Sequence, residues 1–164
     1  MNDAVAALRA GQAVILPTDT VYGLCVLPGN EDVLYELKQR DRSKPIALIA
    51  ADIAALPAEL DRSVLERYLP GAFTLVIAGV GVRVPNLPPE AAAVVREVGV
   101  VAATSANLSG GPDPRRLEDI PEEIRANVGA IVDAGELPGV PSTVIDVTGP
   151  EPVVLRQGAA ELPS

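Results

Sequence analysis

The stretch AVILPTDTVYGL, at residues 13–24, indicates the kind of fold that this chain adopts. Residues 13–16 are apolar and partly β-branched, which is typical of a buried strand, and Pro17 ends that strand because it has no amide hydrogen to donate. Three oxygen-bearing side chains follow at once (TDT), and we expect residues 18–30 to form a loop. Ligands bind at such strand ends in α/β sheets. The loop is either a functional hydroxyl and carboxylate cluster or an ordinary hydroxyl-capped turn.

Outward from this stretch, apolar strands alternate with short helices. Some strands are too close in sequence for a crossover helix between them, so an α/β (α+β) fold with a mixed sheet flanked by helices fits better than a parallel one. No repeat or linker divides the chain, which predicts a single domain over residues 1–164. We expect helices at residues 3–10, 31–39, 52–56, 61–69, 88–98 and from about 121, and further strands at residues 45–50, 73–78, 80–84, 100–103, 130–132, 143–147 and 153–155.

The composition excludes several kinds of chemistry. The 164 residues are 48% hydrophobic with a mean hydropathy of +0.28, which is enough apolar material for one packed core. There is no histidine, so a histidine base or imidazole metal ligand is excluded, and the single cysteine, Cys25, excludes an internal disulfide and a cysteine zinc site. Aromatic residues make up 2% of the chain, which disfavours a stacking platform for single-stranded nucleic acid.

The charge of the chain is acidic overall but not evenly distributed. A net charge of −9 opposes general attraction to a phosphate backbone. The two lysines of the chain are nevertheless Lys38 and Lys44, with Arg40 and Arg42 between them. This cluster is either the solvated end of a helix, where cations suit the helix dipole, or an anion site. No apolar run is long enough to span a bilayer and the N-terminus lacks a basic leader, so we expect a cytoplasmic protein with no membrane contact.

Three further polar segments follow apolar strands. Arg83 stands between β-branched residues, where it needs an anionic partner if it is buried, or else faces water from an edge strand. The segment TSANLSG at residues 104–110 offers hydroxyls, an amide and backbone N–H groups for a phosphate or a nucleobase edge, or caps a helix. The segment STVID at residues 142–146, with Arg156 close behind, is by itself an ordinary strand and turn.

Taken together and in order, these segments closely resemble the YrdC family, the threonylcarbamoyl-AMP synthases. The resemblance spans nearly the whole chain. It rests on PTDTVYGL at residues 17–24, KQR at 38–40, KP at 44–45, PGAFT at 70–74, VRVP at 82–85, TSANLSG at 104–110, STVID at 142–146 and LRQGA at 155–159.

The resemblance implies a fold and an activity. The family fold is a YrdC-like twisted mixed sheet whose helices enclose a concave cleft. The implied enzyme is a nucleotidyltransferase, L-threonylcarbamoyladenylate synthase, which makes threonylcarbamoyl-AMP and pyrophosphate from L-threonine, bicarbonate and ATP for threonylcarbamoyladenosine in tRNA. Mg²⁺ would be held chiefly by ATP oxygens and water rather than by protein ligands. Downstream tRNA threonylcarbamoyltransferase components would consume the product.

The resemblance also implies roles for individual residues. Lys38 and Arg40 are the expected catalytic residues. The expected threonine-binding residues are Thr20, Arg83, Ala103 and Ser142. The expected ATP-binding residues are Lys38, Arg40, Lys44, Ser105, Asn107, Asp113 and Arg156.

The sequence departs from the family pattern at four positions, and two other functions stay open. Asp41 replaces a proline, Gly79 stands where longer members carry a hydroxyl, Asp113 replaces a small hydroxyl residue, and Ile49 replaces a polar residue of some members. One alternative is a YrdC-like module that binds tRNA or double-stranded RNA. The other is a paralogue that uses another carbamoyl-type substrate.

Overall fold

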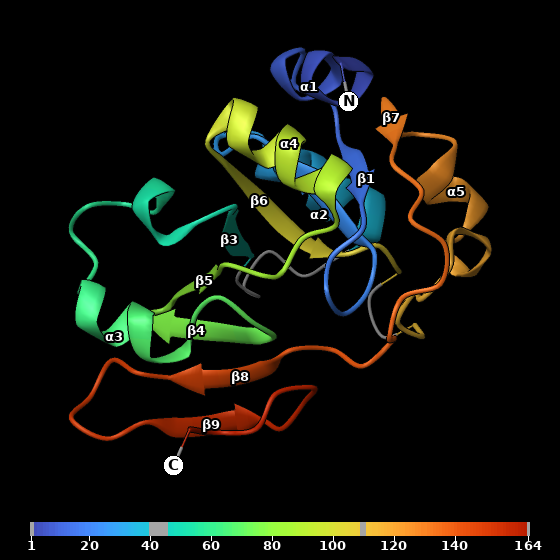
Figure 1. Ribbon diagram of the computed structural model, residues 1–164. Helices are drawn as coiled ribbons and strands as arrows, with labels where there is room; N and C mark the ends of the chain where they lie inside the picture. The colour runs from blue at the N-terminus through green and yellow to red at the C-terminus, as the bar shows by residue number, and fades with distance from the viewer. Residues whose placement is uncertain (1, 40–45, 109–110, 164) are drawn as a thin grey trace.

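The computed structural model describes residues 2–39, 46–108 and 111–163, so the predicted roles of Arg40 and Lys44, and the departure at Asp41, lie outside the described residues. Its centre is a nine-stranded sheet in the order β7-β1-β2-β6-β3-β5-β4-β8-β9 (Figure 1). The strands are β1 (Val14–Leu16), β2 (Gly23–Val26), β3 (Ala47–Ala50), β4 (Phe73–Ile77), β5 (Val80–Arg83), β6 (Val100–Ser105), β7 (Ala130–Ile131), β8 (Thr143–Asp146) and β9 (Val153–Arg156). The helices are α1 (Asn2–Arg9), α2 (Glu31–Lys38), α3 (Arg62–Tyr68), α4 (Pro89–Val98) and α5 (Glu122–Arg125), with 3₁₀ turns at Ile53–Ala55 and Leu117–Asp119.

The sheet is mixed, as the short strand spacings predicted. Strand β1 runs parallel to β7, β3 to β5 and β4 to β8, whereas the other neighbouring pairs are antiparallel. Local signals set several helix ends: Pro89 lies in the first turn of α4, and the Asp61 side chain accepts a hydrogen bond from Ser63 N at 3.0 Å before α3. No helix in the described ranges is long and apolar enough to cross a membrane.

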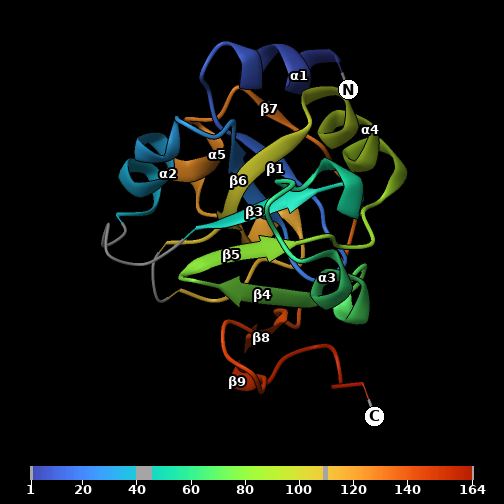
Figure 2. The same ribbon diagram turned by 90° about the vertical axis from the view of Figure 1, so that its left-hand side faces the viewer.

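One half of the sheet, which we call the covered half (β7, β1, β2, β6 and β3), has helices on both faces. On one face, side chains such as Cys25 and Ala103 pack with α1 and α4. On the other face, Leu24 and Ala102 belong to a cluster that includes buried residues of α2 and α5. Figure 2 shows α2 and α5 on the opposite side of these strands from α4. Successive side chains point to opposite faces of a strand, so this half is buried on both sides.

The other half, which we call the open half (β5, β4, β8 and β9), has a packed core on one face. Leu75, Val82 and Ile145 are fully buried in a cluster that includes α3 residues Leu65 and Tyr68. The alternate residues of these strands point to the opposite face, the one that α1 and α4 cover farther along the sheet. That face is where the polar segments meet.

Most of the predicted elements are confirmed, and the structure differs from the prediction in two places. The predicted loop at residues 18–30 contains strand β2, which pairs with β1 on one side and β6 on the other. Four residues that begin with Gly23 carry little local strand signal, and two long-range ladders determine their conformation. The helix predicted at residues 52–56 is a 3₁₀ turn, Ile53–Ala55.

Candidate active site

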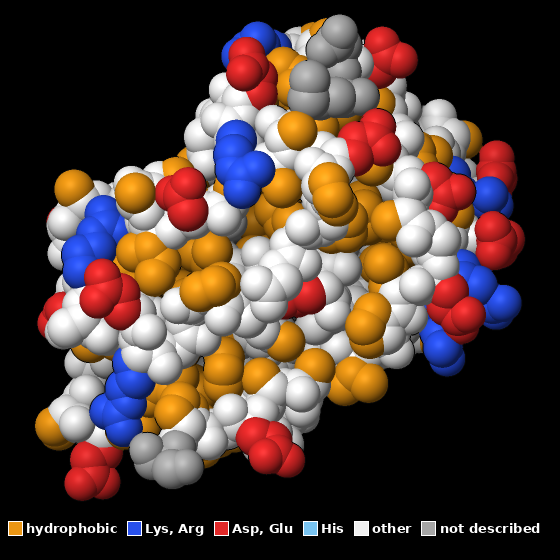
Figure 3. Space-filling model, in the orientation of Figure 1, with side chains coloured by type: hydrophobic (Ala, Val, Ile, Leu, Met, Phe, Trp, Pro, Cys, Tyr) orange, Lys and Arg blue, Asp and Glu red, His pale blue; other side chains and the backbone are white. Residues whose placement is uncertain are grey.

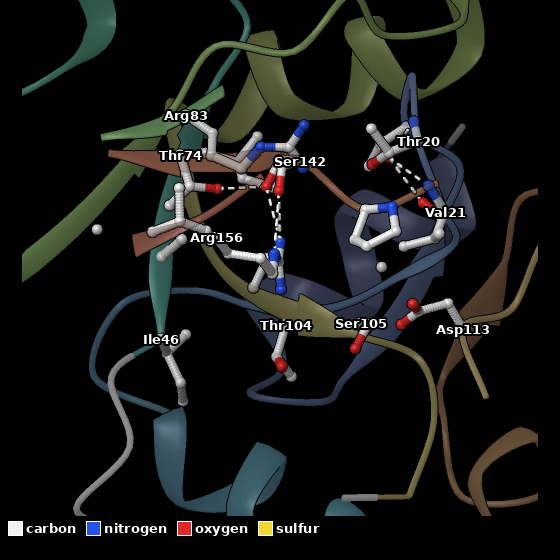
Figure 4. Close-up of a pocket in the computed structure, with 18 of the residues that line it drawn as sticks. Thr20, Val21, Ile46, Thr74, Arg83, Thr104, Ser105, Asp113, Ser142 and Arg156 are labelled. Carbon is white, nitrogen blue, oxygen red and sulfur yellow. Dashed lines mark hydrogen bonds between the residues drawn. The ribbon is translucent and has the colours of Figure 1, made fainter. Parts of the chain in front are cut away.

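A cavity of about 290 Å³ opens on the face of the sheet that the helices leave uncovered, and strands from both halves line it. Its floor is a row of small residues in direct register: Ala103 lies opposite Ala47, and Ala47 lies opposite Gly81. A side chain at Gly81 would pack against the Ala47 and Thr74 side chains at 3.4 Å. The row is therefore hollow because its side chains are small, and polar groups surround the hollow (Figure 4).

Arg83 occupies a central strand and is 8% exposed, so the interpretation as an edge-strand residue is excluded. Its Nη2 donates to Asp19 Oδ1 at 3.0 Å, and its Nε donates to the Phe73 carbonyl at 3.3 Å. Asp19 is held in turn by a hydrogen bond from Asn86 N to Oδ2 at 3.0 Å. Burial lowers the pKa of Arg83, Asp19 opposes that shift, and the nearby charge of Arg156 adds to it. Arg83 thus has the anionic partner that its burial required, and it also faces the cavity.

A second guanidinium approaches the same cavity from β9. Arg156 donates to the Ser142 carbonyl through Nε at 3.1 Å and Nη2 at 2.7 Å, and Nη2 also lies 3.2 Å from Ser142 Oγ. Thr74 Oγ1 and Ser142 Oγ are 2.7 Å apart. A side chain at Gly158 would collide with the carbonyl oxygens of Pro141 and Ser142, which explains the need for glycine there. Figure 4 shows Arg83, Thr74, Ser142 and Arg156 gathered at one side of the cavity.

The threonine-rich segment after β1 forms a hydroxyl-capped turn and also lines the cavity. Thr18 Oγ1 accepts hydrogen bonds from Thr20 N at 3.1 Å and Val21 N at 3.3 Å, and donates to Val21 O at 2.7 Å. Thr18 and Thr20 both line the cavity, as does Asp113. The interpretation as a hydroxyl-capped turn is therefore confirmed, and the functional role of this segment stays a prediction that its place at the cavity makes possible.

The segment after β6 forms a turn at the opposite wall. Thr104 and Ser105 line the cavity, whereas Asn107 is buried behind it. Lys38 reaches this turn from the end of α2, and its Nζ lies 2.6 Å from Ser105 O and 2.8 Å from Asn107 Oδ1. No helix begins at this turn within the described residues, so the capping interpretation does not apply there.

The structure thus brings most of the predicted site residues together. Neither Lys38 nor Asn107 lines the cavity; both lie behind its wall. Among the departures, Ile49 lines the cavity, whereas Gly79 lies outside it in the turn between β4 and β5. The predicted residues that line the cavity are Thr20, Arg83, Ala103, Ser105, Asp113, Ser142 and Arg156.

The sequence-based prediction missed two residues of this site. Asp19 is the partner of Arg83, and Thr74 shares a hydrogen bond with Ser142. Asp19 belongs to the segment PTDTVYGL, and a buried Arg83 needs an anionic partner. The sequence therefore held a signal for this pair. Thr74 ends the PGAFT segment, and only the sheet register places it beside Ser142.

The donor set of the cavity does not resemble a dedicated metal site. Groups of three or more carboxylate or cysteine side chains placed to share an ion do not occur in the part of the chain that the structure describes. Asp19 is engaged by Arg83, and Asp113 is the carboxylate among the described residues that line the cavity. A metal ion here would depend on ligands that a substrate brings.

Guanidinium groups, hydroxyls and a hollow floor on a mixed sheet are the features of a preformed cavity whose chemistry suits small anionic molecules. A family model described as "Telomere recombination", Sua5_yciO_yrdC, matches residues 6–158. The chain belongs to the Sua5/YciO/YrdC family.

Individual relatives agree with this assignment. The chain is 38% identical to the threonylcarbamoyl-AMP synthase of Bacillus subtilis, with 94% of this chain and 52% of that protein covered. It is 33% identical to the threonylcarbamoyl-AMP synthase of Stenotrophomonas maltophilia, with 85% and 88% covered. The crystal structure of Pyrococcus abyssi Sua5 complexed with L-threonine matches with a TM-score of 0.81 at 32% identity, over 94% of this chain and 53% of that one. The chain spans about half the length of the Bacillus and Pyrococcus relatives.

Proposed function

We propose that this protein is an L-threonylcarbamoyladenylate synthase, which converts L-threonine, bicarbonate and ATP into threonylcarbamoyl-AMP and pyrophosphate. Family membership supports the proposal, as do relatives that carry the name threonylcarbamoyl-AMP synthase. The single observation that carries it is the pair of guanidiniums, Arg83 and Arg156, that face one cavity. Their charges repel each other, so the cavity favours anionic ligands. The substrates supply a carboxylate and phosphates.

The reaction suits a site that positions the substrates and neutralises their negative charge, because no side chain has to act as a nucleophile. The amine of threonine attacks the carbon of bicarbonate, and a carbamate forms with loss of water. A carbamate oxygen then attacks the α-phosphorus of ATP, the bond to the β-phosphate oxygen breaks, and pyrophosphate leaves. Alignment of the two groups and stabilisation of developing negative charge lower the barrier for such a displacement. A chain without histidine has the groups for this work.

We assign the two ends of the cavity to the two larger substrates. Arg83, oriented by Asp19, would bind the threonine carboxylate beside Thr20, Ala103 and Ser142. Ser105 and Asp113 would lie on the side of ATP, with Asn107 held behind the wall, and Arg156 would reach ATP from beside Ser142. The ATP contacts expected for Arg40 and Lys44 stay predictions, because both residues lie outside the described ranges. Mg²⁺, which shields phosphate charge when it is bound, would be held by ATP oxygens and water.

Other parts of the proposal concern the setting of the reaction. We expect residues 1–164 to act as one domain in the cytoplasm and to pass the product to tRNA threonylcarbamoyltransferase components. Direct binding of tRNA is less favoured. On the face seen in Figure 3, the described Lys and Arg side chains are interleaved with Asp and Glu and do not form a continuous basic stripe.

An omission experiment tests the proposed function. Purified protein with Mg²⁺ should release pyrophosphate when ATP, L-threonine and bicarbonate are all present, and the release should fall to background when any one is left out. A product with the mass of threonylcarbamoyl-AMP should accumulate in parallel. Release from ATP and bicarbonate with another amine in place of threonine would favour the paralogue. Absence of release with any amine would contradict the proposal.

A further inference from the structure

Lys38 has an unusual position for a lysine in the last turn of a short helix. Cations at helix ends ordinarily extend into water, where they interact with the dipole. The Lys38 residue is instead 1% exposed, and it is among the largest fully buried side chains of the described residues. Burial of an ammonium group is costly unless oxygen atoms surround it. The position of this charge therefore calls for a specific set of partners.

In the described part of the chain, four oxygen atoms at the end of β6 and in the turn that follows it lie around this charge. The Nζ atom of Lys38 lies 2.6 Å from Ser105 O, 2.8 Å from Asn107 Oδ1, 3.2 Å from Thr104 Oγ1 and 3.3 Å from Ser105 Oγ. An ammonium group has three N–H bonds, and these four oxygens are enough to engage all of them. The donors of Lys38 thus point into the protein, toward the turn at the end of β6.

The same turn forms a wall of the cavity. Thr104 and Ser105 line it directly. The amide of Ala106 donates to Tyr22 O at 2.9 Å, which fastens the turn to the neighbouring strand segment. Asn107 Nδ2 donates to Gly111 O at 2.9 Å, and so connects the turn to the segment that carries Asp113. The Lys38 ammonium group lies at the centre of these bonds. It therefore stabilises the position of the turn relative to the segment that carries Asp113.

We infer that Lys38 is a positioning residue: it sets the geometry of the turn at residues 104–107 from behind, rather than binding phosphate itself. The inference rests on the proposed function for its consequence, which is that Ser105 and its neighbours are preorganised for the nucleotide. The amine chemistry of Lys38 takes no part in the reaction.

Hydrogen exchange in the ligand-free protein tests this inference without any assumption about activity. In Lys38→Met, the amides of Ala106 and Asn107 should exchange about tenfold faster or more, since tenfold corresponds to ~1.4 kcal/mol of lost protection. Asn107→Leu, which removes one of the acceptors, should have the same effect. The matched control is Arg9→Met, which removes an exposed cation at the end of α1, and it should leave both amides unchanged.

A kinetic cycle separates positioning from direct contact. If Lys38 acts through the turn, Lys38→Met should raise KM for ATP about tenfold, and Ser105→Ala should add little in the Lys38→Met background. Binding of L-threonine alone should stay within about twofold of wild type, which a general loss of structure would not allow. Additive effects of the two substitutions, together with unchanged exchange in Lys38→Met, would overturn the inference.

A different result would contradict the proposed function. A wild-type protein that releases no pyrophosphate contradicts the synthase but leaves the exchange result intact. If Lys38→Met does not fold, Asn107→Leu decides: unchanged exchange of Ala106 in that variant would overturn the inference. The two proposals therefore fail in different measurements.

Discussion

The two halves of the sheet use the same kind of strand for different purposes. In the covered half, residues such as Val26 and Val14 are fully buried, and helices close both faces. In the open half, one face is equally well packed, but the other carries Arg83, Thr74, Ser142 and Arg156 around a hollow. The difference teaches that the site arises where a helical layer stops and the strand residues at the boundary become small. Stability and binding should accordingly respond to substitutions in different halves.

The largest expected effect is on binding in the open half. Arg83→Gln should lower threonine-dependent pyrophosphate release by about 10²–10³-fold, because the charge opposite the substrate carboxylate is lost. Calorimetric titration with L-threonine should show a matching loss of affinity. Arg96→Gln removes an exposed cation from α4 and serves as the control, with activity unchanged. Full activity in Arg83→Gln would break the distinction between the halves.

The same valine-to-alanine substitution should destabilise the protein more in the covered half than in the open half. Val26→Ala, in the covered half, should lower the free energy of unfolding by about 2–3 kcal/mol, since it leaves a cavity in a sealed core. Val76→Ala, on the open face, should cost less than about 1 kcal/mol because the side chain already borders the hollow. Urea unfolding of both variants measures the contrast. Equal costs would show that the open face is as tightly packed as the core.

A smaller effect is expected at the connection between the halves. Tyr22 Oη donates to Gly135 O at 2.7 Å and accepts from Ala134 N at 3.0 Å, and so fastens the segment that runs from β7 to β8. Tyr22→Phe should lower the free energy of unfolding by about 1–2 kcal/mol, since these groups lose a partner. Burial raises the pKa of Tyr22, so these bonds should persist to alkaline pH. Unfolding of Tyr22→Phe at the wild-type midpoint would contradict this role.

The smallest effect near neutral pH concerns Cys25, beneath the site. Burial raises the pKa of its thiol from 9.0 to about 12. Below pH 9 both folded and unfolded states keep the proton, so pH has no effect through this group. Between pH 9 and 12 the unfolded state ionises first, and stability should fall by ~1.4 kcal/mol per pH unit. Comparison of wild type with Cys25→Ala across this range isolates the slope, and identical slopes would contradict it.

In both halves, the sequence predicts the elements that carry a local signal better than the features that depend on strand pairing. Residues 13–16 show their burial directly, and Pro89 marks the start of α4, because both signals are local. Strand β2 escaped prediction since its conformation comes from pairing with β1 and β6. In the site, Arg83 was identified by its isolated charge among apolar neighbours. The row of Ala103, Ala47 and Gly81 could not be predicted from the sequence, because only the strand register brings these three small residues side by side.

The sheet order has a consequence for how the protein is made. Thr20 and Gly23 reach the cavity from the start of the chain, whereas Ser142 and Arg156 reach it from near residue 164. The ribosome completes the covered half before it releases the strands that finish the opposite wall, and such distant pairings form late in folding. A nascent chain can therefore bury most of its core while it still lacks β8 and β9. Affinity for substrate should therefore appear abruptly, once β8 and β9 have been synthesised and β8 has paired with β4.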